Sequence, residues 1–188
     1  AAWTEAIREP RRYGFHATLK APFTLKEGIV ECDLVAGVNR VAGQQAEISP
    51  LPLVVQKMTR YVALVPELPS PRLEQLASNV VRELDWARAP LTQRDRDRRL
   101  VAGLTPRQCA YLVKYGYPYV HEEFRFHMTL AGPLLEPNLS AIAQRLEDRI
   151  SAEQRNCVVD ALTVLRQDDE TARFRVIARC PLGARQAA

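Results

Sequence analysis

Long hydrophobic runs are missing from this sequence of 188 residues. No stretch approaches the ~20 consecutive apolar residues that a membrane-spanning helix requires, and the start shows no signal-peptide pattern. Hydrophobic residues make up 47% of the chain and charged residues 26%, which is typical of globular proteins in water. The composition therefore predicts a soluble, cytoplasmic protein with no membrane partner.

Cysteine and histidine are both scarce. The four cysteines (Cys32, Cys109, Cys157 and Cys180) form no Cys-x-x-Cys pair and have no histidine at metal-ligand spacing. This pattern predicts buried thiols in a reducing compartment and no metal site. The net charge of +4 suits an anionic substrate, but it is too small to indicate binding to a nucleic-acid duplex.

Two of the three histidines occupy the same position of an internal repeat. Residues 15–23 read Phe-His-Ala-Thr-Leu-Lys-Ala-Pro-Phe, and residues 126–134 read Phe-His-Met-Thr-Leu-Ala-Gly-Pro-Leu. Phe, His, Thr, Leu and Pro thus recur in one frame, 111 residues apart. The repeat predicts two similar halves that face each other, with His16 and His127 in a shared site.

Each copy is expected to be an extended strand, in which side chains alternate between two faces. One face would then hold core residues, and the other would hold the polar ones. The expected core positions of the first copy include Tyr13 and Phe15. The expected polar positions are His16, Thr18 and Lys20 in the first copy, and Arg125, His127 and Thr129 in the second.

A pair of His-x-Thr strands suits acid–base chemistry on a phosphoryl group. Imidazole titrates near pH ~6.5, so one histidine can be a neutral base while the other is a protonated acid. Each threonine offers a hydroxyl that can donate to a phosphate oxygen. A single histidine in a strand is more often structural, but packing alone does not explain a polar His–Thr pair in both copies. The chemistry requires no metal and no other cofactor.

The two His-x-Thr-Leu motifs resemble those of the 2H phosphoesterase superfamily, the LigT-like group that includes bacterial 2′,5′ RNA ligases and cyclic nucleotide phosphodiesterases. A longer set of segments resembles a branch whose genes often lie beside phosphonate-utilisation genes. These segments are Tyr-Gly-Phe-His-Ala-Thr-Leu from Tyr13, Ala-Pro-Leu-Thr from Ala89, Gly-Leu-Thr-Pro-Arg-Gln from Gly103, and Gly-Tyr-Pro-Tyr-Val from Gly116. Because such proteins usually open with a strand before the first motif, we expect further sequence upstream of Ala1.

The predicted elements repeat in order along the chain. Each half should have a motif strand, a helix and two strands, with the helices at 31–45 and 139–151 and the strand pairs at 48–57 with 61–65 and 157–166 with 173–180. A helical insertion with helices at 71–84 and 105–115 would separate the halves. The fold class is therefore α+β: a single bilobed domain of residues 1–188, with lobes at 11–66 and 117–182, an insertion at 70–116, and an active-site cleft between the lobes.

Other residues receive weaker assignments. The charged run at 92–100 is interpreted as a solvated helix face, or as a rim that binds anions. His121 is expected to be a surface or strand-entry residue. Four tyrosines are candidates for an aromatic wall of the substrate pocket, although packing is the commoner role: Tyr13, Tyr115, Tyr117 and Tyr119.

The sequence thus favours a metal-independent phosphodiesterase that opens a small cyclic phosphate. His16 and His127 would be base and acid in either order, and Thr18 and Thr129 would hold phosphate oxygens with Arg125 or Lys20. Through the resemblance, the substrate is expected to be a phosphorylated ribosyl cyclic phosphate. Two alternatives remain open: processing of a 2′,3′-cyclic or 2′,5′-linked RNA terminus, and a module that binds a nucleotide or sugar phosphate without turnover. The oligomeric state is left open too.

Overall fold

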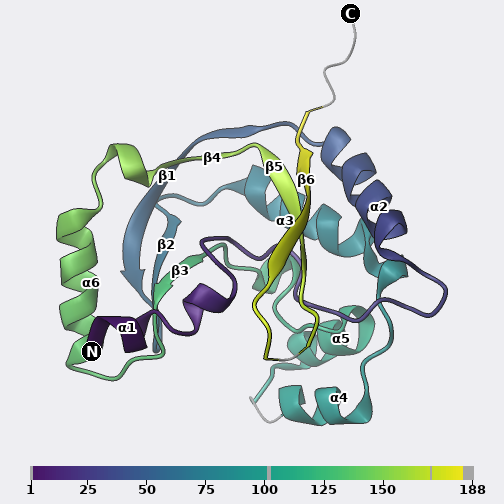
Figure 1. Cartoon of the computed structure of the whole chain (residues 1–188), viewed down its shortest axis with the longest axis horizontal. Coiled ribbons are helices and arrows are strands. Elements are labelled where there is room, and N and C mark those ends of the chain that lie inside the picture. Colours follow the sequence, from purple (N-terminus) through teal and green to yellow (C-terminus); the bar gives the residue numbers. More distant parts are fainter. Residues whose placement is uncertain (1, 101–102, 170, 184–188) are drawn as a thin grey trace, which may run out of the picture. The chain divides into compact units, whose positions relative to one another are not determined.

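The structure is a computed structural model that describes residues 2–100, 103–169 and 171–183 (Figure 1). Its α-helices are α1 (Ala2–Ala6), α2 (Glu31–Gly43), α3 (Pro71–Glu83), α4 (Gln93–Leu100), α5 (Pro106–Tyr115) and α6 (Asn138–Arg149). Its strands are β1 (Ile48–Lys57), β2 (Val62–Pro66), β3 (Met128–Ala131), β4 (Asn156–Val159), β5 (Ala161–Arg166) and β6 (Arg175–Pro181). Short 3-10 helices occur at η1 (Pro10–Arg12), η2 (Asp85–Ala87), η3 (His121–Glu123) and η4 (Glu153–Arg155). The predicted α+β class is confirmed.

The chain forms two compact units, and it passes back and forth between them. Unit 1 consists of Ala1–Thr18, Glu47–Ser70 and Phe126–Arg179. Unit 2 consists of Leu19–Ala46, Pro71–Arg125 and Cys180–Ala188. The lobes expected from the sequence follow chain order, whereas these units alternate along the chain.

Unit 1 contains a four-stranded antiparallel sheet with the strand order β3-β2-β1-β4. The β1–β2 hairpin was predicted from its two β-rich runs, and its register places Val54 opposite Val65. Helix α6 packs along β1 and β2, as Figure 1 shows. Their common core is apolar and contains Ala6, Val62, Ala131, Leu139 and Ile142. This core fixes the position of β3, the strand that carries the second His-x-Thr motif.

A second sheet of unit 1 consists of the two strands β5 and β6. Leu162 and Val164 alternate with more exposed residues along β5, so one face of this strand is buried. The loop between β5 and β6 ends at Phe174, whose N–H donates to the carbonyl of Arg12 at 2.9 Å. This hydrogen bond attaches the β5–β6 loop to the segment that leads into the first motif.

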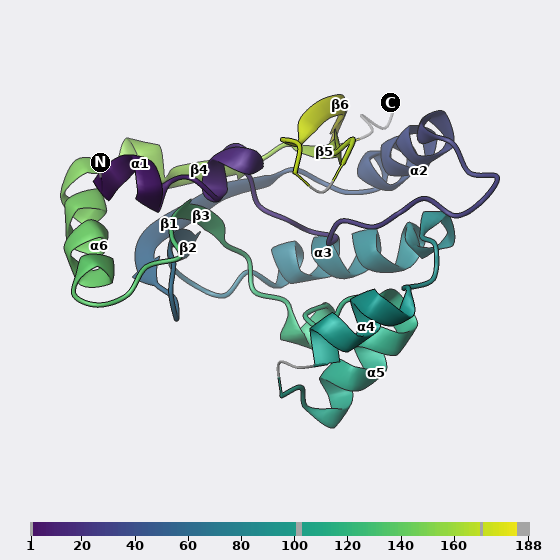
Figure 2. The ribbon, with the colours of Figure 1, turned by 60° about the horizontal axis from the view of Figure 1, so that its bottom comes forward.

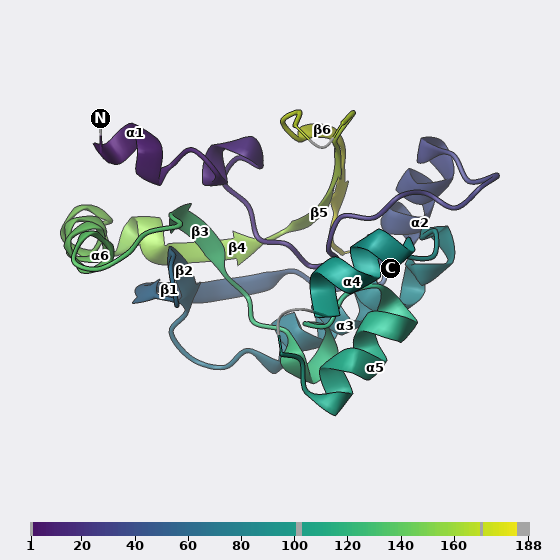
Figure 3. The same ribbon diagram turned by 90° about the horizontal axis from the view of Figure 1, so that it is seen from below.

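Unit 2 is mainly helical, with α2 and α3 packed side by side (Figure 2). The apolar spacing that predicted α3 becomes its buried face, which includes Leu73, Leu76 and Val80. Helix α5 matches the helix expected at 105–115: Thr105 caps its start by accepting from the N–H of Gln108, and it ends at Gly116, which has the left-handed φ of 72°. Figure 3 shows α4 beside α5, where Arg99 of α4 donates to the carbonyl of Gly116.

The structure corrects the prediction for the first motif. Residues 13–20 do not form a strand, because the chain turns at Tyr13 and then takes a φ of 76° at Gly14. Alternation between two faces therefore does not apply here. Phe15, expected in the core, has 65% of its surface exposed.

The four-stranded sheet combines strands from both halves of the sequence, and the predicted two-lobed arrangement stays a prediction. Strands β1 and β2 come from the first half of the sequence and pair with β3 and β4 from the second. Within the described residues, strand structure in unit 2 is limited to the last two residues of β6 and an isolated bridge between Leu25 and Arg88. Hydrogen bonding between strands, which leaves no local pattern in a sequence, decided this arrangement.

Candidate functional site: two His-x-Thr motifs in one unit

The first motif is held by contacts at both nitrogens of His16. Nδ1 lies 3.0 Å from the carbonyl oxygen of Gly14, and Nε2 lies 3.1 Å from the hydroxyl oxygen of Thr18. A carbonyl oxygen only accepts hydrogen bonds, so Nδ1 must carry the proton that is donated to it. In the neutral ring Nε2 then has a lone pair and accepts from Thr18. Nε2 is therefore the nitrogen that can take up or release a proton.

The His16 imidazole is the end member of a stack of three rings, in which the Tyr13 ring lies between it and the Phe174 ring. The Tyr13 ring lies 5.3 Å from the imidazole and 4.7 Å from the Phe174 ring, measured between centroids, with 18° between the planes in each pair. Tyr13 was assigned to a substrate wall from the sequence, and its ring stacks on His16 itself. Phe174 was missed, because a single phenylalanine 158 residues from His16 carries no signal of this contact.

The second motif is held by the sheet. Thr129 lies in β3 opposite Ala63 of β2, and His127 directly precedes the strand. The register shifts between Thr129 and Ala131, so Leu130 is an additional residue on β3 and forms a bulge. His127 and Thr129 are both half-buried. The prediction of a strand is thus confirmed for this copy from Met128 onward.

Both motifs belong to unit 1, and their flanking segments are in contact. Helix η1, just before the first motif, packs against β3. The N–H of Gly132, at the end of β3, donates to the carbonyl of Ala6 at 2.7 Å. Segments more than 100 residues apart in the sequence thus lie side by side.

The two predicted cations belong to unit 2. Lys20 has a buried side chain, 9% exposed, and its ammonium donates to Asp85 at 3.1 Å and to the carbonyl of Val81. Burial lowers the pKa of Lys20 despite the charge of Asp85. Arg125 donates to the carbonyls of Glu122 and Phe124. These contacts commit Lys20 to an ion pair within unit 2.

The other three candidate tyrosines also belong to unit 2. Tyr115 packs edge-on against His121, with ring centroids 4.7 Å apart. Tyr117 contacts Tyr119 on one side and lies under the guanidinium of Arg99 on the other. Their contacts with other side chains fit the packing role that the sequence left open.

His121, expected to be a surface or strand-entry residue, lies at the start of a 3-10 helix. It begins η3 with a φ of 54°, and its Nδ1 is hydrogen-bonded to Ser78. Its Nε2 is buried and has no hydrogen-bond partner among the described residues. Desolvation lowers the pKa of His121, which favours the neutral ring. Within the described residues no three His, Cys, Asp or Glu side chains gather as metal ligands.

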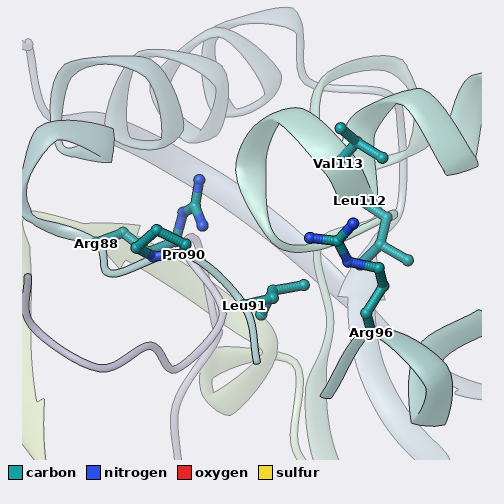
Figure 4. A pocket seen from close by; sticks show the side chains of 6 residues that line it. All are labelled: Arg88, Pro90, Leu91, Arg96, Leu112 and Val113. Atoms are coloured by element: carbon teal, nitrogen blue, oxygen red, sulfur yellow. The ribbon is translucent and has the colours of Figure 1, made fainter. Parts of the chain in front are cut away.

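A cavity of about 240 Å³ occurs in unit 2, between the segment after η2 and helices α4 and α5 (Figure 4). Its lining is Arg88, Pro90, Leu91, Arg96, Leu112 and Val113. The Arg88 guanidinium is engaged in hydrogen bonds within unit 2: it donates to both carboxylate oxygens of Asp85 and to the carbonyl of Lys114. None of the predicted site residues lines this cavity.

Comparison with known proteins identifies the family. The family described as "Protein of unknown function (DUF1045)" matches residues 18–175, and the chain belongs to it. The matched range contains His127, Thr129 and Thr18.

No described helix has both the length and the apolar character needed to cross a membrane.

Two curated relatives are similar over much of the chain, and both are named "Ribose 1,5-bisphosphate phosphokinase PhnN". The protein from Janthinobacterium sp. (strain Marseille) is 37% identical over 181 residues, which is 92% of this chain and 39% of the relative. The protein from Laribacter hongkongensis (strain HLHK9) is 33% identical over 139 residues, which is 74% of this chain and 32% of the relative. The chain thus spans 39% of the first relative's length and 32% of the second's.

Proposed function

We propose that this chain is a metal-independent phosphodiesterase of the 2H type that opens a small cyclic phosphate. The observation that carries the proposal is that both His-x-Thr motifs belong to one compact unit. In the first motif, the hydroxyl of Thr18 is hydrogen-bonded to Nε2 of His16. Two imidazoles can divide the work of base and acid near neutral pH. The pseudo-twofold repeat and the cleft of LigT-like proteins are part of this proposal.

In the proposed reaction one histidine removes a proton from water as the water oxygen attacks phosphorus. The bond between phosphorus and one ring oxygen then breaks, and the other histidine gives its proton to the departing alkoxide. The product is an acyclic phosphate monoester, and one water molecule is consumed. With substrate bound, the Thr18 hydroxyl would turn from Nε2 of His16, and Thr18 and Thr129 would donate to the non-bridging oxygens and stabilise the charge that develops on them.

The names of the relatives support a substrate class. Ribose 1,5-bisphosphate is the product expected when the 1,2-cyclic phosphate of a 5-phosphorylated ribose opens at its O2 bond. An enzyme with this activity would produce the compound in the relatives' name. The relatives join a segment similar to this chain to a further segment, which suits two enzymes that catalyse consecutive reactions. This agrees with the link to phosphonate breakdown that the sequence resemblance implied.

The kinase activity in that name is assigned here to the remaining part of the relatives. Many kinases hold nucleotide phosphates with a Gly-x-x-x-x-Gly-Lys loop. None of the eight glycines of this chain is followed by lysine. The part of the relatives that matches this chain is therefore proposed to carry the phosphodiesterase step.

The test follows ring opening by phosphorus NMR in the presence of EDTA. The panel holds 5-phosphoribosyl 1,2-cyclic phosphate, the nucleoside 2′,3′-cyclic phosphates and a short RNA with a cyclic end. We expect turnover of the ribosyl compound to ribose 1,5-bisphosphate, and its loss in His16→Gln and His127→Gln. In H₂¹⁸O the label should appear on phosphorus, because water attacks there.

Three outcomes would contradict the proposal. Preference for the RNA end, with affinity that falls steeply with salt, would favour RNA processing. Reversible binding of a cyclic phosphate without product would favour a sensor. Full activity in both histidine variants would reject the two-histidine mechanism.

A further inference from the structure

We propose that Phe174 positions His16, by holding Tyr13 against the imidazole in a three-ring stack. This inference rests on the proposed function only for its effect on turnover, since the stack itself is a property of unit 1. Phe174 and Tyr13 would act through His16 and would not touch the substrate's phosphorus. The proposal therefore gives Tyr13 a different role from the substrate wall expected from the sequence.

The backbone around His16 does not hold this residue in a sheet. Residues 13–18 form no regular element, and Gly14 has a φ of 76° with open space around its α-carbon. The hydrogen bond at Nδ1 reaches only two residues back along the same irregular segment. Contacts from outside the segment are needed to fix the plane of the ring.

The ring stack supplies such a contact indirectly, because Phe174 lies outside the segment and stacks on Tyr13, which in turn stacks on His16. Tyr13 is nearly parallel to both neighbours, His16 and Phe174. An imidazole with its edges on Gly14 and Thr18 and a face on Tyr13 is restrained in rotation about both side-chain torsions. Its Nε2 then points in one direction, which suits a group that must take a proton from water or give one to the leaving oxygen.

Phe174 is itself held in place by backbone hydrogen bonding. Its N–H donates to the carbonyl of Arg12, the residue before Tyr13, so the two aromatic residues are joined by backbone as well as by rings. The loop before it is closed by Asp169, whose carboxylate accepts from the N–H groups of Thr171 and Ala172. Strand β6 follows at once with Arg175. The position of Tyr13 therefore depends, through Phe174, on the position of strands β5 and β6.

The test compares Phe174→Leu with two matched variants. Leucine keeps apolar bulk but cannot stack, whereas Phe174→Tyr keeps the ring. Val176→Ala is the control, because Val176 lies in β6 two positions after Phe174 and is 63% exposed. Far-UV circular dichroism and thermal unfolding verify that each variant is folded.

The structural readout is the NMR signal of the imidazole, which does not depend on any substrate. The chain has three histidines, so three Hε1–Cε1 signals are expected and can be assigned with histidine variants. We expect the ring-current shift of the His16 signal to fall in Phe174→Leu and to persist in Phe174→Tyr and Val176→Ala. An unchanged His16 signal in Phe174→Leu would overturn the proposal.

The catalytic readout uses the cyclic phosphate that the wild type turns over. We expect Phe174→Leu to lower kcat by about 10- to 100-fold with little change in KM, because a displaced acid–base group affects the transition state more than substrate binding. A rise in KM alone would show that Phe174 contacts substrate and would also overturn the proposal. If the wild type turns over no substrate, the proposed function fails, while the NMR comparison still decides the role of Phe174.

Discussion

The two His-x-Thr motifs have nearly the same sequence but are held in different ways. The second lies on β3, where pairing with β2 places Thr129 opposite Ala63. The first lies on irregular backbone, where hydrogen bonds to Gly14 and Thr18 and the Tyr13 ring hold His16. Equivalent residues in a repeat can therefore depend on a sheet in one copy and on side-chain contacts in the other.

This difference separates two ways in which the motifs can fail. Damage to the second copy should disturb the sheet and the core around it, and so reduce the stability of unit 1. Damage to the first copy should move His16 while the sheet remains. Substitutions at six positions, with Gly28→Ala as a control, test this contrast and the use of the cations in unit 2.

The largest effect is expected from the histidines themselves. His16→Gln and His127→Gln should each lower kcat by about 10²- to 10⁴-fold, because each removes one acid–base group. The measurement is the pH profile of kcat/KM, in which each variant should lose a different limb of the bell. Loss of the same limb in both would mean that the histidines do not divide the roles of base and acid.

Gly132→Ala should cost the most stability. Gly132 ends β3 with a φ of 131°, and an added Cβ would lie 2.7 Å from the carbonyl oxygen of Arg60 and 2.6 Å from the Tyr61 ring. We expect unfolding free energy to fall by about 3 kcal/mol, since backbone must shift. Urea denaturation measures the change, and a cost below that of Gly14→Ala would contradict the contrast.

Lys20→Met tests whether the cation of the first copy serves the fold or the substrate. Lys20 is buried against Asp85, which retains Arg88 as a second partner. We therefore expect a loss of about 2 kcal/mol in unfolding free energy, less than for a pair left with no partner. Unchanged kcat/KM would accompany it. A large loss of kcat/KM at full stability would instead assign Lys20 to phosphate binding.

Gly14→Ala should reduce activity more than stability. The added Cβ meets no atom within 4 Å, so the cost is that of a left-handed φ, about 1 kcal/mol. If the backbone relaxes instead, His16 moves with its Gly14 hydrogen bond and kcat falls by about tenfold. Gly28→Ala is the matched control, because Gly28 has a φ of 80° and equally open space but lies in unit 2. Equal activity losses in both variants would refute the local explanation.

The smallest effect is expected in the pH dependence of unit 2. Burial raises the pKa of Asp85, but hydrogen bonds from Arg88 and the charge of Lys20 outweigh it, so its pKa lies below the ordinary value of 3.8. The unfolded chain then binds the proton more readily, and this contribution to stability is present above about pH 4 and is lost as pH falls through the lower, folded pKa. The measurement is the thermal unfolding midpoint as a function of pH. Asp85→Asn should reduce the fall of this midpoint at acid pH, and an unchanged fall would contradict the role given to Asp85.

Much of the secondary structure could be predicted from local patterns. Helices α2, α3 and α6 follow their apolar spacing, and α5 coincides with the helix expected at 105–115, between Thr105 and Gly116. The β1–β2 hairpin follows its two apolar runs. The strand expected at 13–20 was wrong because the alternating pattern there is broken by one torsion angle, at Gly14.

The sequence by itself determined which residues repeat: two His-x-Thr pairs, in a frame that points to phosphate chemistry. Only the tertiary structure decided that both belong to one unit, that Nε2 of His16 faces Thr18, that Lys20 is used by Asp85, and that Phe174 reaches Tyr13. The reason is physical. Helix spacing and caps act over a few residues and leave a local pattern, whereas ring stacking, ion pairs and strand pairing join residues that no local pattern relates.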